Sequence, residues 1–140
     1  MDKSIFTLGG ALWINLVNTT YISNKQTIDI LANASSALQW LKENNLLRES
    51  DELYIEQKES LDSLIVELQS IRTLCNIILS EITQSGQLSL ETTNRIKKAI
   101  EKLQINPTIN AKSDKLRMTF EGKTVEDHVM YNMMDSMMHT

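Results

Sequence analysis

An apolar stripe along one long segment constrains the fold of this chain more than any other feature. Over residues 51–84 the stripe recurs at steps of three and four, and Gly86 closes the segment. Its members are Leu61, Leu64, Ile65, Leu68, Ile71, Cys75, Ile78 and Ile82. Residues 53–60 are more polar and predict a separate turn or a kinked start. An isolated helix of this kind is unstable in water, so the stripe predicts a long central helix that packs on other elements.

Residues that favour helix ends divide the rest of the chain into further helices. The 140 residues include four Gly and one Pro, and so few turn-forming residues favour long helices over many short strands. Asn33 can cap the start of one helix, and Asn44–Asn45 can end it. Ser89 can cap another helix, which Pro107 prevents from continuing. A last helix is expected from about Thr124 to the chain end.

Short strands are expected at two places. Residues 4–8 resemble a strand stopped by two glycines, whereas residues 11–21 mix two periodicities and favour a helix. Residues 108–110 and 116–120 read as two strands around a turn at 112–115. The predicted fold class is therefore α+β and mainly α, with about four to five helices around the long central one and a small antiparallel sheet built from the first strand and the hairpin.

Composition and charge narrow the class of protein. A chain of this length fits a single domain over residues 1–140. The net charge of −4 disfavours binding to nucleic acid, whose phosphates attract basic surfaces. The lone cysteine, Cys75, fits a reducing compartment. The start of the chain lacks a signal peptide, and the apolar run at 11–17 is too short to cross a membrane. We therefore expect a cytoplasmic protein that binds no membrane.

The sequence shows none of the motifs that carry catalysis or bind a cofactor. A Gly-rich phosphate loop and a Ser-centred nucleophile elbow are both absent. His128 and His139 cannot form a conventional zinc site with one distant cysteine, because structural zinc needs four ligands. The acid pairs are neighbours in sequence and therefore diverge on a helix. We expect no enzyme activity, no cofactor and no metal site.

Five of the seven methionines fall in the last helix. They share one face with two valines, in the order Val125, Val129, Met130, Met133, Met134, Met137 and Met138. Flexible thioethers fill irregular core gaps, which predicts a core or domain-contact face. The alternatives are a soft cuprous-copper site at Met133, Met137 and His139, or an interaction face of Met130, Met133, Met134, Met137 and Met138 that supports a homodimer. The apolar face runs to Met138 without a capping Gly, as in a helix that frays or a chain cut before a following segment.

A polar cluster interrupts the apolar stretch near the start of the chain. Asn15, Asn18 and Thr19 need hydrogen-bond partners if this stretch is buried. In one interpretation they tie down loop backbone. In the other they line a ligand pocket with Trp13, Trp40 and Arg72. Arg72 is the basic residue within the apolar central helix, and we expect it to pair with an acid such as Asp29 or to hold a ligand anion.

The same stretch resembles a known family. Residues 9–19, Gly-Gly-Ala-Leu-Trp-Ile-Asn-Leu-Val-Asn-Thr, are similar to the opening Gly-x-x-Leu-x-Leu-Asp-Phe-x-Asn-Thr of the bacterial ABATE domain of the CGNR zinc-finger family. Residues 29–47 are similar to its next block, which ends in Trp-Leu and Gly-Leu-Leu. Ile71-Arg72 falls where that family has Leu-Arg in its long helix. The resemblance covers nearly the whole chain, although Asn15 stands in place of the family's Asp.

The resemblance implies a regulatory or ligand-sensing domain of a stress-response transcription regulator. Its ligand would be a small molecule of unknown identity. Members of that family continue into a zinc knuckle with a Cys-Gly-Asn-Arg motif, the presumed DNA-binding part, and these 140 residues contain no such segment. We therefore expect a truncated chain that binds no DNA directly. A protein-interaction or dimerisation module that uses the methionine face is the alternative.

Overall fold

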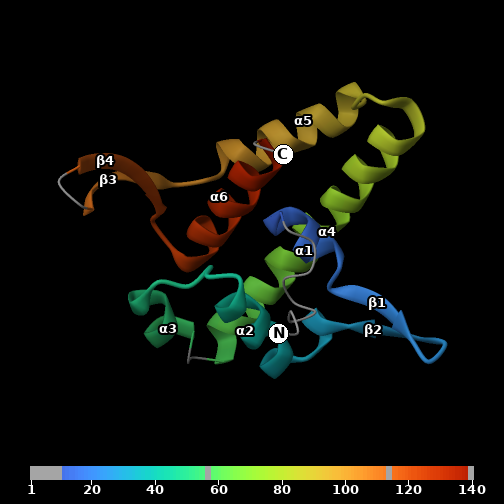
Figure 1. Cartoon of the computed structure of the whole chain (residues 1–140), viewed down its shortest axis with the longest axis horizontal. Helices are drawn as coiled ribbons and strands as arrows, with labels where there is room; N and C mark the ends of the chain where they lie inside the picture. The colour runs from blue at the N-terminus through green and yellow to red at the C-terminus, as the bar shows by residue number, and fades with distance from the viewer. Residues whose placement is uncertain (1–10, 56–57, 113–114, 139–140) are drawn as a thin grey trace.

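The computed structural model describes residues 11–55, 58–112 and 115–138. Within them the chain forms six α-helices, one short 3-10 helix and two β-hairpins (Figure 1). In chain order these are α1 (Leu12–Val17), β1 (Thr20–Ser23), β2 (Gln26–Asp29), η2 (Ile30–Ala32), α2 (Ala34–Glu43), α3 (Glu49–Ile55), α4 (Lys58–Ser85), α5 (Leu90–Glu101), β3 (Ile105–Lys112), β4 (Lys115–Gly122) and α6 (Val125–Met138). The predicted strand at residues 4–8 lies outside the described residues.

The long helix α4 is the centre of the fold, as the apolar stripe predicts. It contacts α1, α2, α3, α5 and α6, and its stripe is buried from Leu61 to Ile78. Ile82 is 46% exposed, because the end of α4 extends beyond the helices that cover its first part (Figure 1). The polar residues before α4 form the separate helix α3. The α+β, mainly α class is thereby confirmed.

The helix α4 also has the length and composition of a membrane-spanning segment. Residues Glu59–Ser85 form a continuous helix with a window of mean hydropathy 1.2. Its apolar side chains pack on α1, α2 and α6, and polar groups such as Glu67 and Gln69 occupy its outer surface. A one-sided stripe of this kind is typical of a core helix in a globular protein.

Residues 11–21 form less helix than expected. The helix α1 ends at Val17, and the chain turns into the hairpin of β1 and β2, which the sequence did not suggest. Asn24 and Lys25 join the two strands with φ of 51° and 63°. Such a pair of left-handed residues suits a two-residue hairpin turn, because its twist matches that of the strands. This hairpin and that of β3 and β4 are separate two-stranded sheets in the described chain, and the predicted pairing with residues 4–8 lies outside the described residues.

The predicted helix caps are confirmed. Asn33 accepts hydrogen bonds from the backbone N–H groups of Ser35 and Ser36 at 2.8 and 3.3 Å. Asn45, after the end of α2, has the left-handed φ of 56° that ends a helix. Ser89 caps α5 through the N–H of Thr92, at 3.1 Å. These ends are local, so the sequence alone predicts them.

The hairpin of β3 and β4 projects from the body, and we call it the arm. Its eight paired positions run from Ile105–Gly122 to Lys112–Lys115, longer than the predicted strands. Figure 1 shows the arm extending away from the helices, with α6 following directly from its base. β4 is the strand that contacts α6 most. The arm is therefore attached at one end and free over much of its length.

Candidate functional site

Arg72, from the predicted polar cluster, is held inside the protein. Its guanidinium donates to both carboxylate oxygens of Asp29, at 2.7 and 2.9 Å, and to the hydroxyl of Thr19, at 2.9 Å. Thr19 is fully buried and donates in turn to the carbonyl of Leu16. The hydrogen bond from Arg72 lowers the pKa of Asp29 below its usual 3.8. The expected pairing with Asp29 is confirmed, and the pair links α4 to the end of β2.

The neighbouring residues of the predicted site serve similar contacts. The Asn15 side chain is buried and donates to the side chain of Asn44 at 2.9 Å, which ties α1 to the end of α2. Asn18 is exposed and ends α1, where its N–H bonds to the carbonyl of Ile14. Trp13 is buried, and its backbone N–H donates to Ser136 on α6. Trp13 and Asn15 thus join α1 to α6 and to the end of α2, whereas the Asn18 bond lies within the end of α1.

Trp40 is the exception in this set. Its side chain is fully buried, and its indole N–H has no hydrogen-bond partner among the described residues. A buried donor without a partner costs about 1–3 kcal/mol. Neither Trp40 nor Arg72 lines the groove that runs between α4, α5 and α6. The structure thus brings Thr19, Arg72 and Asp29 together and bonds them to one another.

The methionine face of α6 is mostly inside the protein. Met130, Met133 and Met134 are buried against the core, with exposures of 8%, 0% and 4%. The predicted core role is confirmed for them, and the predicted interaction face is wrong for these three. Met137 is half-buried beside Cys75, with 3.8 Å between the sulfurs, and Met138 is 56% exposed. Burial raises the pKa of the Cys75 thiol to about 12, so it is not a nucleophile near neutral pH.

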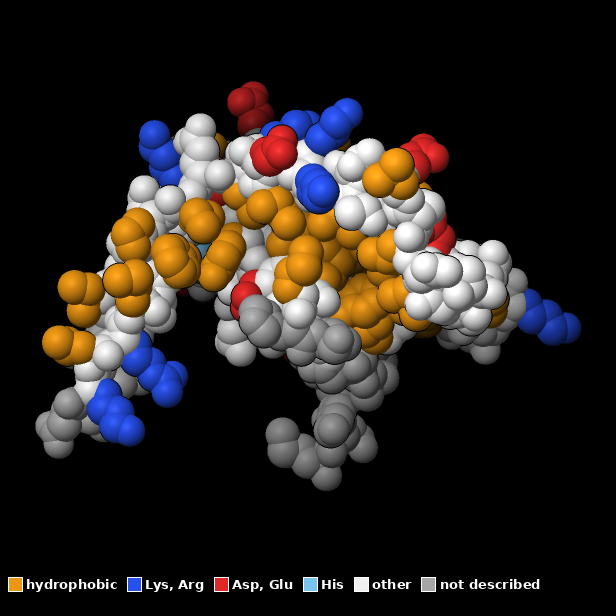
Figure 2. All heavy atoms as spheres, turned by 90° about the horizontal axis from the view of Figure 1, so that it is seen from above, with side chains coloured by type: hydrophobic (Ala, Val, Ile, Leu, Met, Phe, Trp, Pro, Cys, Tyr) orange, Lys and Arg blue, Asp and Glu red, His pale blue; other side chains and the backbone are white. Residues whose placement is uncertain are grey.

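The arm carries the largest set of exposed apolar side chains in the described structure. Residues directly opposite each other in an antiparallel pair point to the same face. The register therefore places these apolar side chains on one face: Ile105, Pro107, Ile109, Leu116, Met118 and Phe120. Ile109, Leu116 and Met118 are 77%, 78% and 71% exposed. Figure 2 shows this row of apolar side chains along the arm, with basic side chains near its far end.

The opposite face of the arm is polar. By the same register, Asn106, Thr108, Arg117, Thr119 and Glu121 share it. The hydroxyls of Thr108 and Thr119 form a cross-strand hydrogen bond at 2.7 Å. Alternation of this kind is typical of a strand with one face in water and one face covered. In this chain the outer part of the apolar face, with Ile109, Leu116 and Met118, has no cover in the described structure.

Four groups fix the base of the arm to the body. Arg48 donates to the carbonyl of Gly122 at 2.8 Å, and its guanidinium is held by the buried carboxylate of Asp51 at 2.7 and 3.0 Å. The Gly122 N–H donates to Nδ1 of His128 at 3.2 Å. A Cβ on Gly122 would collide with the backbone nitrogen of His128, so only glycine fits there. Neither Arg48 nor Gly122 stands out in the sequence, because the contact that joins them spans 74 positions.

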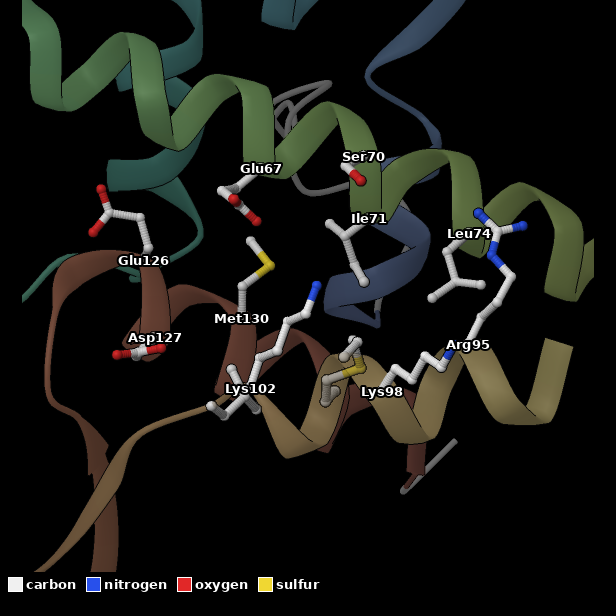
Figure 3. Close-up of a pocket in the computed structure, with 13 residues that line it drawn as sticks. Glu67, Ser70, Ile71, Leu74, Arg95, Lys98, Lys102, Glu126, Asp127 and Met130 are labelled. Atoms are coloured by element: carbon white, nitrogen blue, oxygen red, sulfur yellow. The ribbon is translucent and has the colours of Figure 1, made fainter.

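A groove runs between α4, α5 and α6. Its volume is about 420 Å³, and its floor consists of apolar side chains such as Ile71, Leu74 and Met130. Lysines and an arginine of α5 form one rim, and Glu67, Glu126 and Asp127 form the other. In Figure 3 Lys102 reaches into the groove beside Met130. No ion pair engages the α5 cations within the described part of the chain.

Comparison with known proteins adds no identification. No family model, no curated protein and no solved structure matches this chain. The ABATE resemblance therefore stays a prediction. Among the described residues, no group of three or more His, Cys, Asp or Glu side chains is placed to hold a metal ion. The proposed copper ligand His139 lies outside them. The candidate sites are thus the apolar face of the arm and the groove.

Proposed function

We propose that this chain is a protein-interaction module whose contact surface is the apolar face of the arm. The observation that carries the proposal is the exposure of Ile109, Leu116 and Met118 on one face of a projecting hairpin. Soluble monomers rarely expose contiguous apolar patches of more than a few hundred Å², and larger ones mark contact sites. This function corresponds to the alternative proposed from the sequence, with the arm in place of the methionine helix.

Site-specific photo-crosslinking tests this proposal. A photoreactive amino acid is placed at Met118, on the apolar face, and in a matched control at Thr119, the next residue on the opposite face. Both chains are expressed in the cells that naturally make the protein. We expect covalent protein adducts from position 118 at several times the yield from position 119. Equal yields from both positions, or adducts from neither, would show that the apolar face contacts no protein.

Ligand sensing by a stress-response regulator is a second candidate function. The groove supports it, because its volume of about 420 Å³ lies in the range of small-molecule sites and its apolar floor has a charged rim. This site differs from the polar cluster predicted from the sequence, where Arg72 already binds Asp29. The anionic dye anilinonaphthalene sulfonate probes it. Lys102→Glu should weaken dye binding and Lys97→Glu should not, since Lys97 is not part of the groove. Dye binding that Met118→Lys abolishes would place the dye on the arm instead.

We also propose that the chain acts in the cytoplasm, is not an enzyme and does not bind nucleic acid. The lone buried cysteine supports the first proposal, the absence of a Gly-rich phosphate loop and of a Ser-centred nucleophile elbow from these 140 residues supports the second, and the net charge of −4 supports the third. A filter-binding titration against duplex DNA at about 50 mM salt, where phosphate contacts are strongest, tests the last one. Saturable binding there would contradict it.

A further inference from the structure

We infer that the partner of the arm is a second copy of this chain, with the two apolar faces packed together and the two arms antiparallel. This inference rests on the proposed interaction function and specifies its partner. It is carried by three features of the arm: the area of its apolar face, the distribution of charge along its length and the way its base is fixed.

The exposed area of the apolar face is large enough for a dimer interface. Side chains of this size present about 150–200 Å² each when fully exposed. With the exposures of Ile105, Ile109, Leu116, Met118 and Phe120, which range from 38% to 78%, one arm offers on the order of 500 Å². Two such faces would bury on the order of 1,000 Å², about the lower limit for a specific interface. The face carries no charged side chain, so a second copy leaves no buried charge unpaired.

Charge along the arm favours an antiparallel arrangement. At the far end the described residues Lys115 and Arg117 are basic, whereas residues 121–127, at the base, include three acids and one cation. A two-fold axis through the middle of the face places each basic end over the acidic base of the partner. Lys115 and Arg117 lie on the polar face, so their attraction to the acidic base of the second copy acts through space, is weakened by salt and forms no direct ion pair. Parallel arms would place like charges together, which costs energy.

The arm is fixed before it binds. Arg48 and His128 hold Gly122, and the ring of Phe120 contacts that of Tyr131 on α6, with 6.3 Å between the centroids. A surface that is already ordered loses less conformational freedom on association than a flexible loop does. These contacts anchor the base and leave the outer apolar side chains exposed, as expected for a preformed contact surface.

Sedimentation velocity on the purified chain, from about 1 to 100 μM, tests whether the partner of the arm is a second copy of the chain. We expect the wild type to reach the mass of a dimer. Met118→Lys should weaken dimerisation at least tenfold, because it buries a charge, and Leu116→Lys should do the same. Thr119→Lys adds the same charge to the polar face and should leave the dimer intact. Circular dichroism checks that each variant is folded; these side chains are exposed or half-buried, so the core is unchanged.

A short bismaleimide crosslinker tests whether the two arms of the dimer are antiparallel. Ile109→Cys lies near the middle of the face, close to the two-fold axis, so the introduced thiol should crosslink to its own copy. Leu116→Cys lies near the far end and should not, because antiparallel arms hold the two ends apart. Thr108→Cys, on the polar face, is the control, and the buried Cys75 thiol should give no background.

Each other outcome overturns the inference in a distinct way. A wild-type chain that stays monomeric, while position 118 crosslinks to another protein in cells, would leave the proposed interaction function standing and refute the second copy. A monomer that cosediments with vesicles of phosphatidylcholine and phosphatidylserine through Met118 would show a membrane surface instead. A dimer that Met118→Lys does not weaken would place the interface elsewhere. Crosslinking of Leu116→Cys as efficient as that of Ile109→Cys would refute the antiparallel arrangement.

Discussion

Arg72→Met tests whether the bond to Asp29 is a structural tie or an occupied ligand position. The guanidinium makes two hydrogen bonds to the carboxylate and one to Thr19, and these contacts join α4 to the first hairpin. Methionine keeps an unbranched apolar side chain of similar length, so packing along the stem changes little. The substitution therefore removes the charged contacts and leaves the shape of the site nearly unchanged.

The exposure and the remaining contacts of the pair set how much stability Arg72→Met should cost. Breaking a buried ion pair costs about 3–5 kcal/mol, because the remaining charge is left unpaired. Here the side chains of Arg72 and Asp29 are 13% and 29% exposed, so water can replace part of the lost contact. Asp29 also keeps the backbone N–H of Leu31 at 2.9 Å. We therefore expect a loss of about 2 kcal/mol in the free energy of unfolding, or roughly 8 °C in Tm for a chain of this size.

A double-mutant cycle with Asp29→Asn measures the coupling free energy between Arg72 and Asp29. Asparagine keeps an oxygen that can accept from Leu31, so this variant loses the charge and retains the cap. Urea unfolding of the two single variants and the double variant at pH 7 should give a coupling of about 1.5 kcal/mol. The folded pKa of Asp29 lies below its unfolded value, so this stability is present above about pH 4 and is lost as pH falls through the folded pKa. A coupling near zero, with Arg72→Met as stable as wild type, would refute the structural role and favour an anion site.

Three further predictions concern the arm base and the last helix. Gly122→Ala should cost at least about 2 kcal/mol in urea unfolding, because its Cβ would collide with the backbone of His128, whereas Gly86→Ala, in open space, should cost only about 1 kcal/mol. Burial, and after it the charge of Arg48, lowers the pKa of His128 in the folded state. The free energy of unfolding of the wild type should therefore fall as the pH drops below 6.5 towards that folded pKa. His128→Asn keeps an acceptor for the N–H of Gly122, so it should flatten this pH dependence between about pH 7.5 and 5.5. Met133→Ala should cost about 3 kcal/mol in thermal unfolding and Met138→Ala less than about 0.5, and equal effects would contradict the packing of α6.

Several elements could be predicted because their causes are local. The spacing of the stripe from Leu61 to Ile78 identifies α4 and its buried face, and side chains such as Asn33 and Ser89 cap the helices that they begin. Apolar and polar side chains alternate along the strands of the arm with a period of two. Pro107 prevents the preceding helix from continuing into the arm. The first hairpin was missed because its four-residue strands are short and largely exposed, so the helical spacing of Trp13 and Val17 dominated the pattern.

The candidate sites depend on contacts that no local pattern contains. By itself the sequence determined the long helix, the helix caps and the place of the arm in the chain, since these follow from neighbours a few residues apart. The tertiary structure decided which of its expected partners Arg72 binds, the carboxylate of Asp29, and it decided that Arg48 reaches Gly122 across 74 positions. It also decided which apolar faces are covered. Met133 has the periodicity of an interaction face and is buried, whereas Met118 is exposed, because burial depends on which distant elements pack against each face.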